Sequence, residues 1–367
     1  MNRAFIVAEI GTAHGGDFGL ARDLVKAAAS CGADAAKFQC VYADEILHPL
    51  AGTVRLPGGD VPLYERFRCL ERGEDFYARL KAMTEEEGLV FMCSPFGMQS
   101  ARILRDIGTP AIKIASPELN HFPLLREVAS YGRSLVLSSG VSTLADIEKA
   151  LSALREGSGG GGGSGCTLLH CVTAYPAPEE EYNIRVIPNL AAVFGLPAGV
   201  SDHSRDPILV PVLAALHGAA MIEKHFTLDT EGGGLDDPIA LGPRDFGIMV
   251  REVRAAESEK AAGRAAEARE AIEAAYGADR VRRVLGNGVK SLAPSEAANY
   301  AATRRSIHAR VEIPAGEEFS PANTAVLRSE KNLRPGLGPE FLDLILGRPA
   351  ARGVPAGEGI TWDEILA

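Results

Sequence analysis

Two lysines and several serines have the chemistry needed to bind a small anion. Lys37 and Lys113 each belong to a short apolar run, and serines end or follow further runs of the same kind. Ammonium groups, hydroxyls and backbone amides are the donors that hold phosphate and carboxylate groups. The combination predicts a clamp for a phosphorylated or dicarboxylic anion.

Two histidines have the chemistry needed to bind a divalent cation. His203 and His225 end two neighbouring runs, so both imidazoles can point at one spot. With water or a carboxylate from Glu9, Glu118 or Glu223, they form a plausible site for Mn²⁺, Co²⁺ or another divalent ion. Glu118 is also a candidate general base, or a group that orients the substrate.

Eight apolar runs supply the strands that must position these residues. Longer amphipathic stretches, such as 20–32, 74–88 and 143–157, separate them and are typical of helices. Continuous rather than alternating hydrophobicity indicates strands buried on both faces, as in parallel sheets. The alternation predicts an α/β fold, a (β/α)8 TIM barrel; an open doubly wound sheet is the competitor, but no GxGxxG motif follows the first strand. The runs are 5–10, 35–39, 89–94, 111–116, 134–139, 167–171, 198–202 and 220–226.

Every one of these runs ends in polar side chains. Barrel enzymes carry their chemistry at the carboxyl ends of the strands, and an inert barrel has no reason to bury a ring of charge there. We therefore expect an enzyme. The ring comprises Glu9, Lys37, Gln39, Ser94, Lys113, Ser116, Glu118, Ser138, Ser139, His170, Thr173, Tyr175, Ser201, Asp202, His203, Glu223, Lys224 and His225.

A change from alternating apolar runs and helical stretches to short strand-like pieces and turns divides the chain into two domains. We expect the barrel over 1–285, a linker over 286–302 and a compact, mostly β domain over 303–367, which contains the repeated phrase Pro-Ala-Gly-Glu. The glycine-rich run 157–165 is not followed by the Lys-Ser/Thr pair that a phosphate-binding loop requires. It is predicted to be a tolerated loop on the barrel face away from the chemistry.

Composition excludes several classes of function. With 38 Lys and Arg against 48 Asp and Glu, the net charge is −10, which disfavours nucleic-acid binding. No apolar run is long enough to span a membrane and the first residues do not read as a signal peptide, so a cytoplasmic protein is expected. The six cysteines include no CxxC pair and are predicted to be free thiols.

The order and spacing of many short motifs resemble the N-acetylneuraminate (sialic acid) synthase family. That family includes the legionaminic and pseudaminic acid synthases and the spore-coat polysaccharide synthases. The second domain resembles its C-terminal antifreeze-like (SAF) domain. The matching segments are AEIGTAHGG (8–16), KFQ (37–39), SPF (94–96), KIASPE (113–118), SSG (138–140), HCVTAYP (170–176), GVSDHS (199–204), EKHFT (223–227), and, after the barrel, the stretch from GNGVKS to VEIPAG and LRPGLGP.

The resemblance implies a metal-dependent condensation of phosphoenolpyruvate with an N-acyl aldosugar, such as N-acetylmannosamine or a 2,4-diacetamido hexose. The products are a nonulosonic 2-keto acid and phosphate. A domain-swapped homodimer is implied, in which each SAF domain caps the barrel of the other subunit. The implied metal is Mn²⁺, with Mg²⁺ or Co²⁺ as alternatives.

The resemblance also implies roles for individual residues. Phosphoenolpyruvate is held by Lys37, Ser94, Lys113, Ser116, Ser138, Ser139, Thr173 and Ser201; the sugar by Gln39, Tyr175, Asp236 and Arg334; the metal by His203 and His225; and catalysis falls to Glu9, Glu118 and Lys113.

Some positions depart from the family pattern, mostly near the acceptor sugar. Thr173 replaces a common Asn, the segment Gly234–Asp237 keeps only the Asp of the usual Gly-Pro-Asp-His, and 50–65 has no clear match. Other readings remain open. They are a related 3-deoxy-2-ketoacid synthase acting on a phosphorylated aldose, a lyase that forms a Schiff base through Lys113, and a non-catalytic carbohydrate-binding barrel.

Overall fold

Eight parallel strands close into a barrel in the order β1-β10-β9-β8-β7-β6-β5-β2. This computed structural model describes residues 3–56, 59–159, 165–330 and 332–366. The barrel strands are β1 (Phe5–Gly11), β2 (Ala35–Cys40), β5 (Val90–Pro95), β6 (Ala111–Ile114), β7 (Ser134–Ser138), β8 (Cys166–Cys171), β9 (Ala198–Asp202) and β10 (Met221–His225). The eight predicted runs thus match the barrel strands, and the prediction of a (β/α)8 barrel is confirmed.

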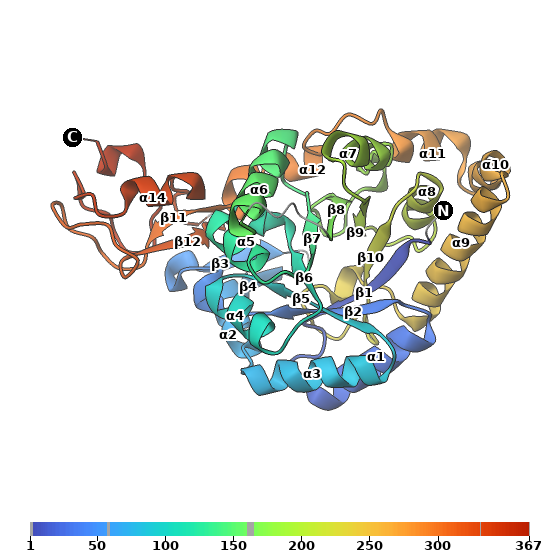
Figure 1. Cartoon of the computed structure of the whole chain (residues 1–367), viewed down its shortest axis with the longest axis horizontal. Coiled ribbons are helices and arrows are strands. Elements are labelled where there is room, and N and C mark those ends of the chain that lie inside the picture. The colour runs from blue at the N-terminus through green and yellow to red at the C-terminus, as the bar shows by residue number, and fades with distance from the viewer. Residues whose placement is uncertain (1–2, 57–58, 160–164, 331, 367) are drawn as a thin grey trace.

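A helix follows each barrel strand and covers the outside of the sheet (Figure 1). The apolar stripe of each helix packs on strands that are buried on both faces, which accounts for the continuous hydrophobicity of the runs. Thr143 caps α6 by accepting a hydrogen bond from the Asp146 N–H. The helices are α1 (Phe18–Ser30), α3 (Glu74–Glu86), α4 (Met98–Asp106), α5 (Phe122–Ala129), α6 (Leu144–Gly157), α7 (Val186–Phe194), α8 (Leu209–Leu216) and α9 (Pro243–Ala261).

Two additions modify the barrel. Between β2 and α3 lie a hairpin of β3 (Thr53–Leu56) and β4 (Gly59–Pro62) and the helix α2 (Leu63–Leu70). After α9 come α10 (Ala265–Tyr276) and α11 (Ala278–Leu285). The glycine-rich run begins at the end of α6 and leads to β8; its residues 160–164 lie outside the described residues.

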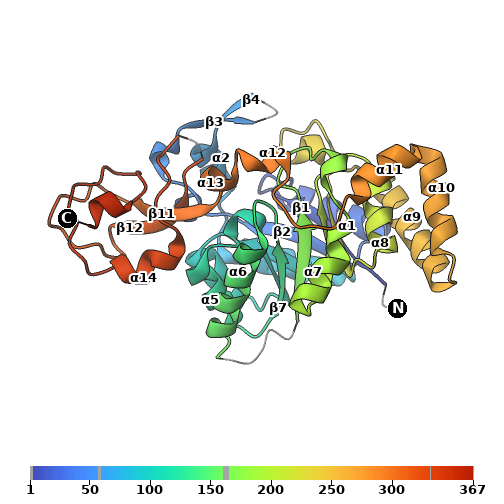
Figure 2. The same ribbon diagram turned by 90° about the horizontal axis from the view of Figure 1, so that it is seen from above.

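The chain then crosses the barrel end to reach the C-terminal domain. Figure 2 shows α12 (Pro294–Ala297) and α13 (Tyr300–Thr303) running over the barrel between α11 and β11 (Arg305–Ala309). In the C-terminal domain β11 pairs antiparallel with β12 (Thr324–Arg328), and α14 (Leu342–Ile345) follows. The two copies of the repeated phrase face each other, because Ile313 and Val354 exchange backbone hydrogen bonds of 2.9 and 2.8 Å.

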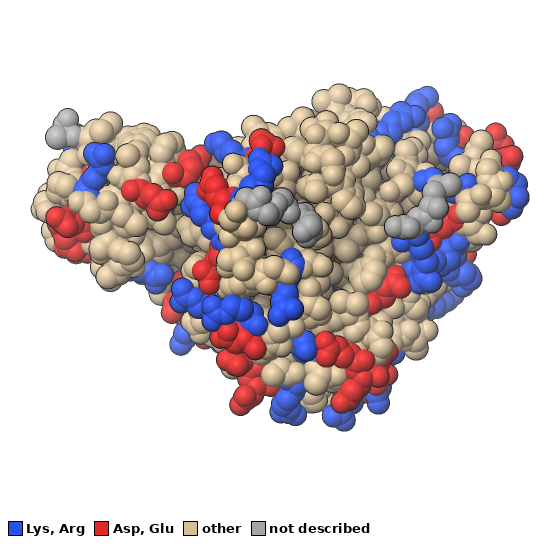
Figure 3. Space-filling view, in the orientation of Figure 1, with Lys and Arg blue, Asp and Glu red and all other residues tan. Residues whose placement is uncertain are grey.

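The surface and the cysteines agree with the composition. Basic and acidic side chains are interspersed on the face shown in Figure 3. All six cysteines are free thiols, as predicted. Among the described residues, none of the helices combines the length and apolar character that crossing a membrane requires.

Candidate active site

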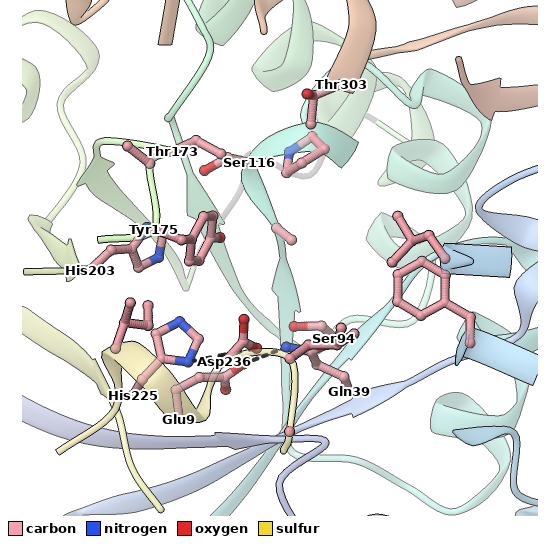
Figure 4. A pocket seen from close by; sticks show the side chains of 18 of the residues that line it. Glu9, Gln39, Ser94, Ser116, Thr173, Tyr175, His203, His225, Asp236 and Thr303 are labelled. Carbon is pink, nitrogen blue, oxygen red and sulfur yellow. Dashed lines mark hydrogen bonds and ion pairs between the residues drawn. The ribbon is translucent and has the colours of Figure 1, made fainter. Parts of the chain in front are cut away.

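A cavity of about 1030 Å³ opens at the carboxyl ends of the barrel strands. Residues from β1, β2, β5, β6, β7, β8, β9 and β10 line it, since the carboxyl ends of parallel strands meet at one face of a barrel. The predicted site residues that line this cavity are Glu9, Lys37, Gln39, Ser94, Lys113, Ser116, Ser138, Thr173, Tyr175, Ser201, His203, His225 and Asp236. Figure 4 shows ten of the lining side chains, labelled, facing the same space.

Two lysines and two carboxylates form a buried ionic cluster at the floor of the cavity. The Lys37 Nζ lies 2.9 Å from Glu9 Oε2 and 3.5 Å from Glu223 Oε1, and the Lys113 Nζ lies 3.5 Å from the same Glu223 oxygen. All four side chains are almost completely buried. Such a group is stable only because each charge has an opposite partner nearby.

The cluster separates the pKa values of the two lysines. Burial opposes the charge of Lys37, but Glu223 and Glu9 outweigh it and raise its pKa. For Lys113 burial dominates and lowers the pKa, with Glu223 offsetting only part of the effect. Burial alone would raise the pKa of Glu223, but Lys113 and Lys37 lower it to about 2, so this carboxyl stays ionised. Lys37 is therefore a fixed cation, and Lys113 is the better suited of the two to transfer a proton.

Three hydroxyls of the cavity have no hydrogen-bond partner among the described residues. They belong to Ser94, Ser138 and Thr173, all buried. A buried hydroxyl without a partner costs free energy, so hydroxyls in this state mark a place for ligand atoms. The other two predicted serines that line the cavity are engaged: Ser116 Oγ accepts the Gly140 N–H at 3.0 Å, and Ser201 Oγ donates to Glu223 at 2.9 Å. Together with the lysines, the hydroxyls form a candidate anion site.

His203 and His225 lie side by side, with ring centroids 5.2 Å apart. The His203 Nδ1 is 2.9 Å from the Val172 carbonyl oxygen, which can only accept, so Nδ1 carries a proton and Nε2 is the nitrogen available to a metal. Burial, followed by the neighbouring His203, lowers the pKa of His225 to about 3, which keeps this ring neutral. Burial would lower the pKa of His203, but the neighbouring Cys171 outweighs burial and raises it. His225 is therefore ready to bind a divalent metal as a neutral ring, whereas His203 would have to give up a proton on binding one. Within the described ranges no three His, Cys, Asp or Glu side chains converge on one point, so a metal held by the two histidines would need water or substrate as further ligands.

The residues predicted to bind the sugar surround the histidines. Tyr175 stacks on His203 with centroids 4.4 Å apart, and Asp236 Oδ2 lies 3.8 Å from His225 Nδ1. Gln39 Nε2 donates to Glu9 Oε1 at 2.8 Å and so links this group to the ionic cluster. Ser94 and Thr173, two residues with unpartnered hydroxyls, thus share one cavity with the histidine pair (Figure 4).

Comparison with protein families identifies both parts of the chain. Residues 24–266 match the model of the NeuB family, and residues 304–366 match that of the SAF domain. The chain belongs to the NeuB family.

Several relatives resemble this NeuB-family chain over nearly its whole length. It is 35% identical to the spore coat polysaccharide biosynthesis protein SpsE of Bacillus subtilis, over 99% of this chain and 93% of that protein. The crystal structure of that protein matches with a TM-score of 0.83 at 34% identity, covering 100% of this chain and 96% of that one. The N,N'-diacetyllegionaminic acid synthase of Legionella pneumophila is 32% identical, over 99% of this chain and 95% of that protein. The N-acetylneuraminate-9-phosphate synthase of Mus musculus is 31% identical, over 85% of this chain and 79% of that protein.

Three predicted site residues of the NeuB-family chain do not line the cavity. Glu118 is fully buried, and its Oε1 lies 2.9 Å from Arg305 Nη2 and 2.6 Å from Arg328 Nη2, because the short 3₁₀ turn after β6 directs it to the C-terminal domain. Ser139 donates its hydroxyl to the Leu169 carbonyl at 3.1 Å, since consecutive strand residues face opposite sides. These two side chains do not contribute directly to the site as predicted.

The third residue, Arg334, lies in the C-terminal domain of the NeuB-family chain. Its Nη2 is 2.8 Å from Glu364 Oε1, and it does not line the cavity of its own barrel. Its predicted role in a partner's barrel stays a prediction.

Sequence reasoning on the NeuB-family chain missed one wall of the cavity and three arginines that line it, Arg66, Arg205 and Arg328. Five apolar residues of one packed cluster form that wall. Arg328, at the end of β12, also lines the cavity, and no sequence signal distinguishes it from other arginines. The wall lies partly in 50–65, where no motif matched, and its signal was the amphipathic pattern of α2. Its residues are Leu63, Phe67, Phe96, Ala115 and Leu235.

Proposed function

We propose that this chain condenses phosphoenolpyruvate with an N-acyl aldosugar, giving a nonulosonic 2-keto acid and inorganic phosphate. The observation that carries the proposal is the anion site, where Lys37 and Lys113 lie in the same cavity as the unpartnered hydroxyls of Ser94, Ser138 and Thr173. Phosphoenolpyruvate presents a phosphate and a carboxylate, and this set of donors suits both. The names of the legionaminic acid and neuraminate-9-phosphate synthases support the same reaction class.

The reaction joins two carbon atoms and releases phosphate. C3 of phosphoenolpyruvate attacks the aldehyde carbon of the sugar, and the aldehyde oxygen gains a proton. Water adds to the cation that develops at C2 and loses a proton. The bond between C2 and the phosphate oxygen then breaks and phosphate leaves, while the C2 hydroxyl loses its proton and becomes the ketone. His203 and His225 would hold a divalent ion, Mn²⁺ or alternatively Mg²⁺ or Co²⁺, which would supply Lewis acidity toward the aldehyde oxygen.

The side chains of the cavity have distinct tasks in this scheme. Lys37 holds negative charge, because its pKa is raised and it stays protonated. Lys113, whose pKa burial lowers, binds the phosphate and donates a proton to it as it leaves. Glu9 accepts the proton of the attacking water. Tyr175, Gln39 and Asp236 contact the sugar beside the histidines.

Phosphate release from phosphoenolpyruvate tests the proposal. The assay contains Mn²⁺ and one of a panel of aldoses: N-acetylmannosamine, its 6-phosphate, mannose, and 2,4-diacetamido-2,4,6-trideoxyhexoses. We expect release that needs both the metal and one acylated sugar and that stops with a chelator. Lys113→Ala should abolish release, whereas Lys81→Ala, which alters a lysine paired with Glu85 on α3, should not. Release without any sugar, or none with any sugar, contradicts the proposal. Borohydride trapping of pyruvate on Lys113 would point instead to a lyase.

The phosphorylated sugar in the panel distinguishes two acceptor classes. The mouse relative is named for a phosphorylated product, whereas the Legionella relative is named for a diacetylated one. A homodimer with exchanged C-terminal domains is part of the proposal, and the mass of the protein in solution tests it.

A further inference from the structure

Two charged residues in the segment between the barrel and the C-terminal domain form hydrogen bonds to the backbone of the turn that follows β7. The Lys290 Nζ donates to the Ser139 carbonyl oxygen at 2.8 Å, and Glu296 Oε1 accepts the Val141 N–H at 2.7 Å. Glu296 is almost completely buried but does not line the active-site cavity. Both residues therefore act on the backbone of the turn that carries Ser138.

The backbone of this turn is strained at Val141. Val141 has a φ of +42°, in the left-handed region, and its side chain is fully buried. A β-branched residue rarely adopts this conformation, because its side chain collides with the backbone. The strain persists only where the surroundings hold the backbone in place, and strained positions cluster at functional sites. The hydrogen bond to Glu296 is one such restraint.

The same carboxylate oxygen also holds a second loop. Glu296 Oε1 accepts the Thr173 N–H at 2.6 Å. Between the two loops lies Gly140, where an added Cβ would be 2.0 Å from Thr173 Oγ1, 2.8 Å from Ser116 Oγ and 3.0 Å from Glu296 Oε1. The loops after β6, β7 and β8 are thus packed so closely that one acceptor sets the distance between them.

We propose that Glu296 is a positioning residue for the anion site. It fixes the turn after Ser138 and the backbone of Thr173, and so sets the spacing of two of the three hydroxyls that await a ligand. The proposal rests on the proposed function only in taking phosphoenolpyruvate as that ligand. It also makes the segment between the two domains a structural part of the anion site.

Steady-state kinetics of Glu296 variants test this role. Glu296→Ala should raise the KM for phosphoenolpyruvate by about 10-fold or more, the size of effect seen when groups supporting a site are lost. The KM for the aldose should change little. Glu296→Gln keeps one acceptor oxygen, so its KM for phosphoenolpyruvate should lie between those of the wild-type protein and Glu296→Ala. It replaces Glu296→Ala if that variant does not fold.

Glu181→Ala is the matched control. Glu181, further along the loop after β8, accepts the N–H of Ser295 at 3.1 Å through Oε2, and among the described residues its side chain makes no hydrogen bond to Val141 or Thr173. This variant removes a contact to the same segment but keeps the hydrogen bonds from Val141 and Thr173 to Glu296. An equal rise in KM for phosphoenolpyruvate in both variants would overturn the proposal, as would no rise in Glu296→Ala.

Amide hydrogen exchange gives a second measurement that needs no activity. Exchange in peptides containing Val141 and Thr173 should accelerate in Glu296→Ala but not in Glu181→Ala. Unchanged exchange contradicts the proposal even if the wild-type protein is active. If the wild-type protein releases no phosphate with any sugar, the proposed function fails, and the exchange result still decides whether Glu296 restrains the two loops.

Discussion

Glu118 Oε1 lies 2.6 Å from Nη2 of Arg328, so a carboxylate of the barrel is paired with a cation of the C-terminal domain. The same oxygen is 2.9 Å from Nη2 of Arg305, and the side chains of Glu118 and Arg305 are completely buried. This carboxylate is therefore engaged as the counter-ion of two guanidinium groups instead of facing the cavity. Glu118 joins the two domains and holds Arg328 at the edge of the cavity.

Removing this carboxylate should destabilise the protein. Glu118→Ala leaves two buried guanidinium groups without their counter-ion, and we expect the free energy of unfolding to fall by about 3–5 kcal/mol. Urea denaturation measures the change. Glu148→Ala removes an exposed partner of Arg155 and should cost about 1 kcal/mol or less. A stable Glu118→Ala protein that had lost only its turnover would restore the role of general base.

Loss of either histidine should weaken metal binding. His203→Ala and His225→Ala each remove one of the two imidazoles, and we expect the affinity for Mn²⁺ to fall by about 100-fold or more. Calorimetric titration of protein dialysed against a chelator measures this without any turnover. His217→Ala changes a histidine on the outer side of the barrel, after α8, and is the control. Unchanged Mn²⁺ affinity in both site variants would show that the ion binds elsewhere or not at all.

Stability should fall as the pH is lowered from 6.5 toward 4. Burial, with Lys290, lowers the pKa of His170 to about 3, and burial lowers that of His308 to about 4. In the unfolded chain both titrate near 6.5, so the unfolded state binds more protons in this range. Each histidine should contribute a slope of about 1.4 kcal/mol per pH unit between its two pKa values.

The measurement for this prediction is urea unfolding at a series of pH values and constant ionic strength. His308→Asn should reduce the slope between pH 6.5 and 4.5, because one of the titrating groups is gone. Equal stability of the wild-type protein at these two pH values would mean that the histidines are not held neutral. Glu223 acts differently: its pKa of about 2 lies below that of an unfolded Glu, so its contribution is lost only below about pH 4.5.

Mixing two inactive variants tests whether Arg334 acts in a partner's barrel. Lys113→Ala removes a lysine of the active-site cavity in the barrel, and Arg334→Ala removes the side chain that pairs with Glu364 in the C-terminal domain. If the domains are exchanged, a mixed dimer has one site with an intact barrel and an intact C-terminal domain. Random pairing should then restore about a quarter of the active sites. No recovery, with mixed dimers demonstrated by mass, would place the function of Arg334 within its own subunit.

The barrel and most of its site could be predicted because both depend on local sequence. Each strand is a short apolar run, and each run carries its polar residues at the carboxyl end, as in Lys37 and His225. Closure of the barrel then brings these ends together without further information. These side chains come from separate segments of the chain, yet their position on the strands was enough to predict that they meet.

The direction of Glu118 could not be predicted, because its partners are distant in sequence. Arg305 and Arg328 lie 187 and 210 positions further along the chain. The sequence shows only that Glu118 follows a strand, and the turn after that strand decides which side it faces. Glu296 was missed for the same reason, since its partners Val141 and Thr173 are 155 and 123 positions away.

The place where α6 ends and β8 begins has a practical consequence. Gly157 ends α6 and Cys166 begins β8, so the chain passes from one to the other at the amino end of the strand, opposite the cavity. A peptide tag or fluorophore inserted between Gly157 and Gly165 would be separated from the catalytic mouth by the full depth of the barrel. The protein could be tethered there to a surface or a force probe with its mouth facing the solution. Substrate entry could then be followed on single molecules whose orientation is known.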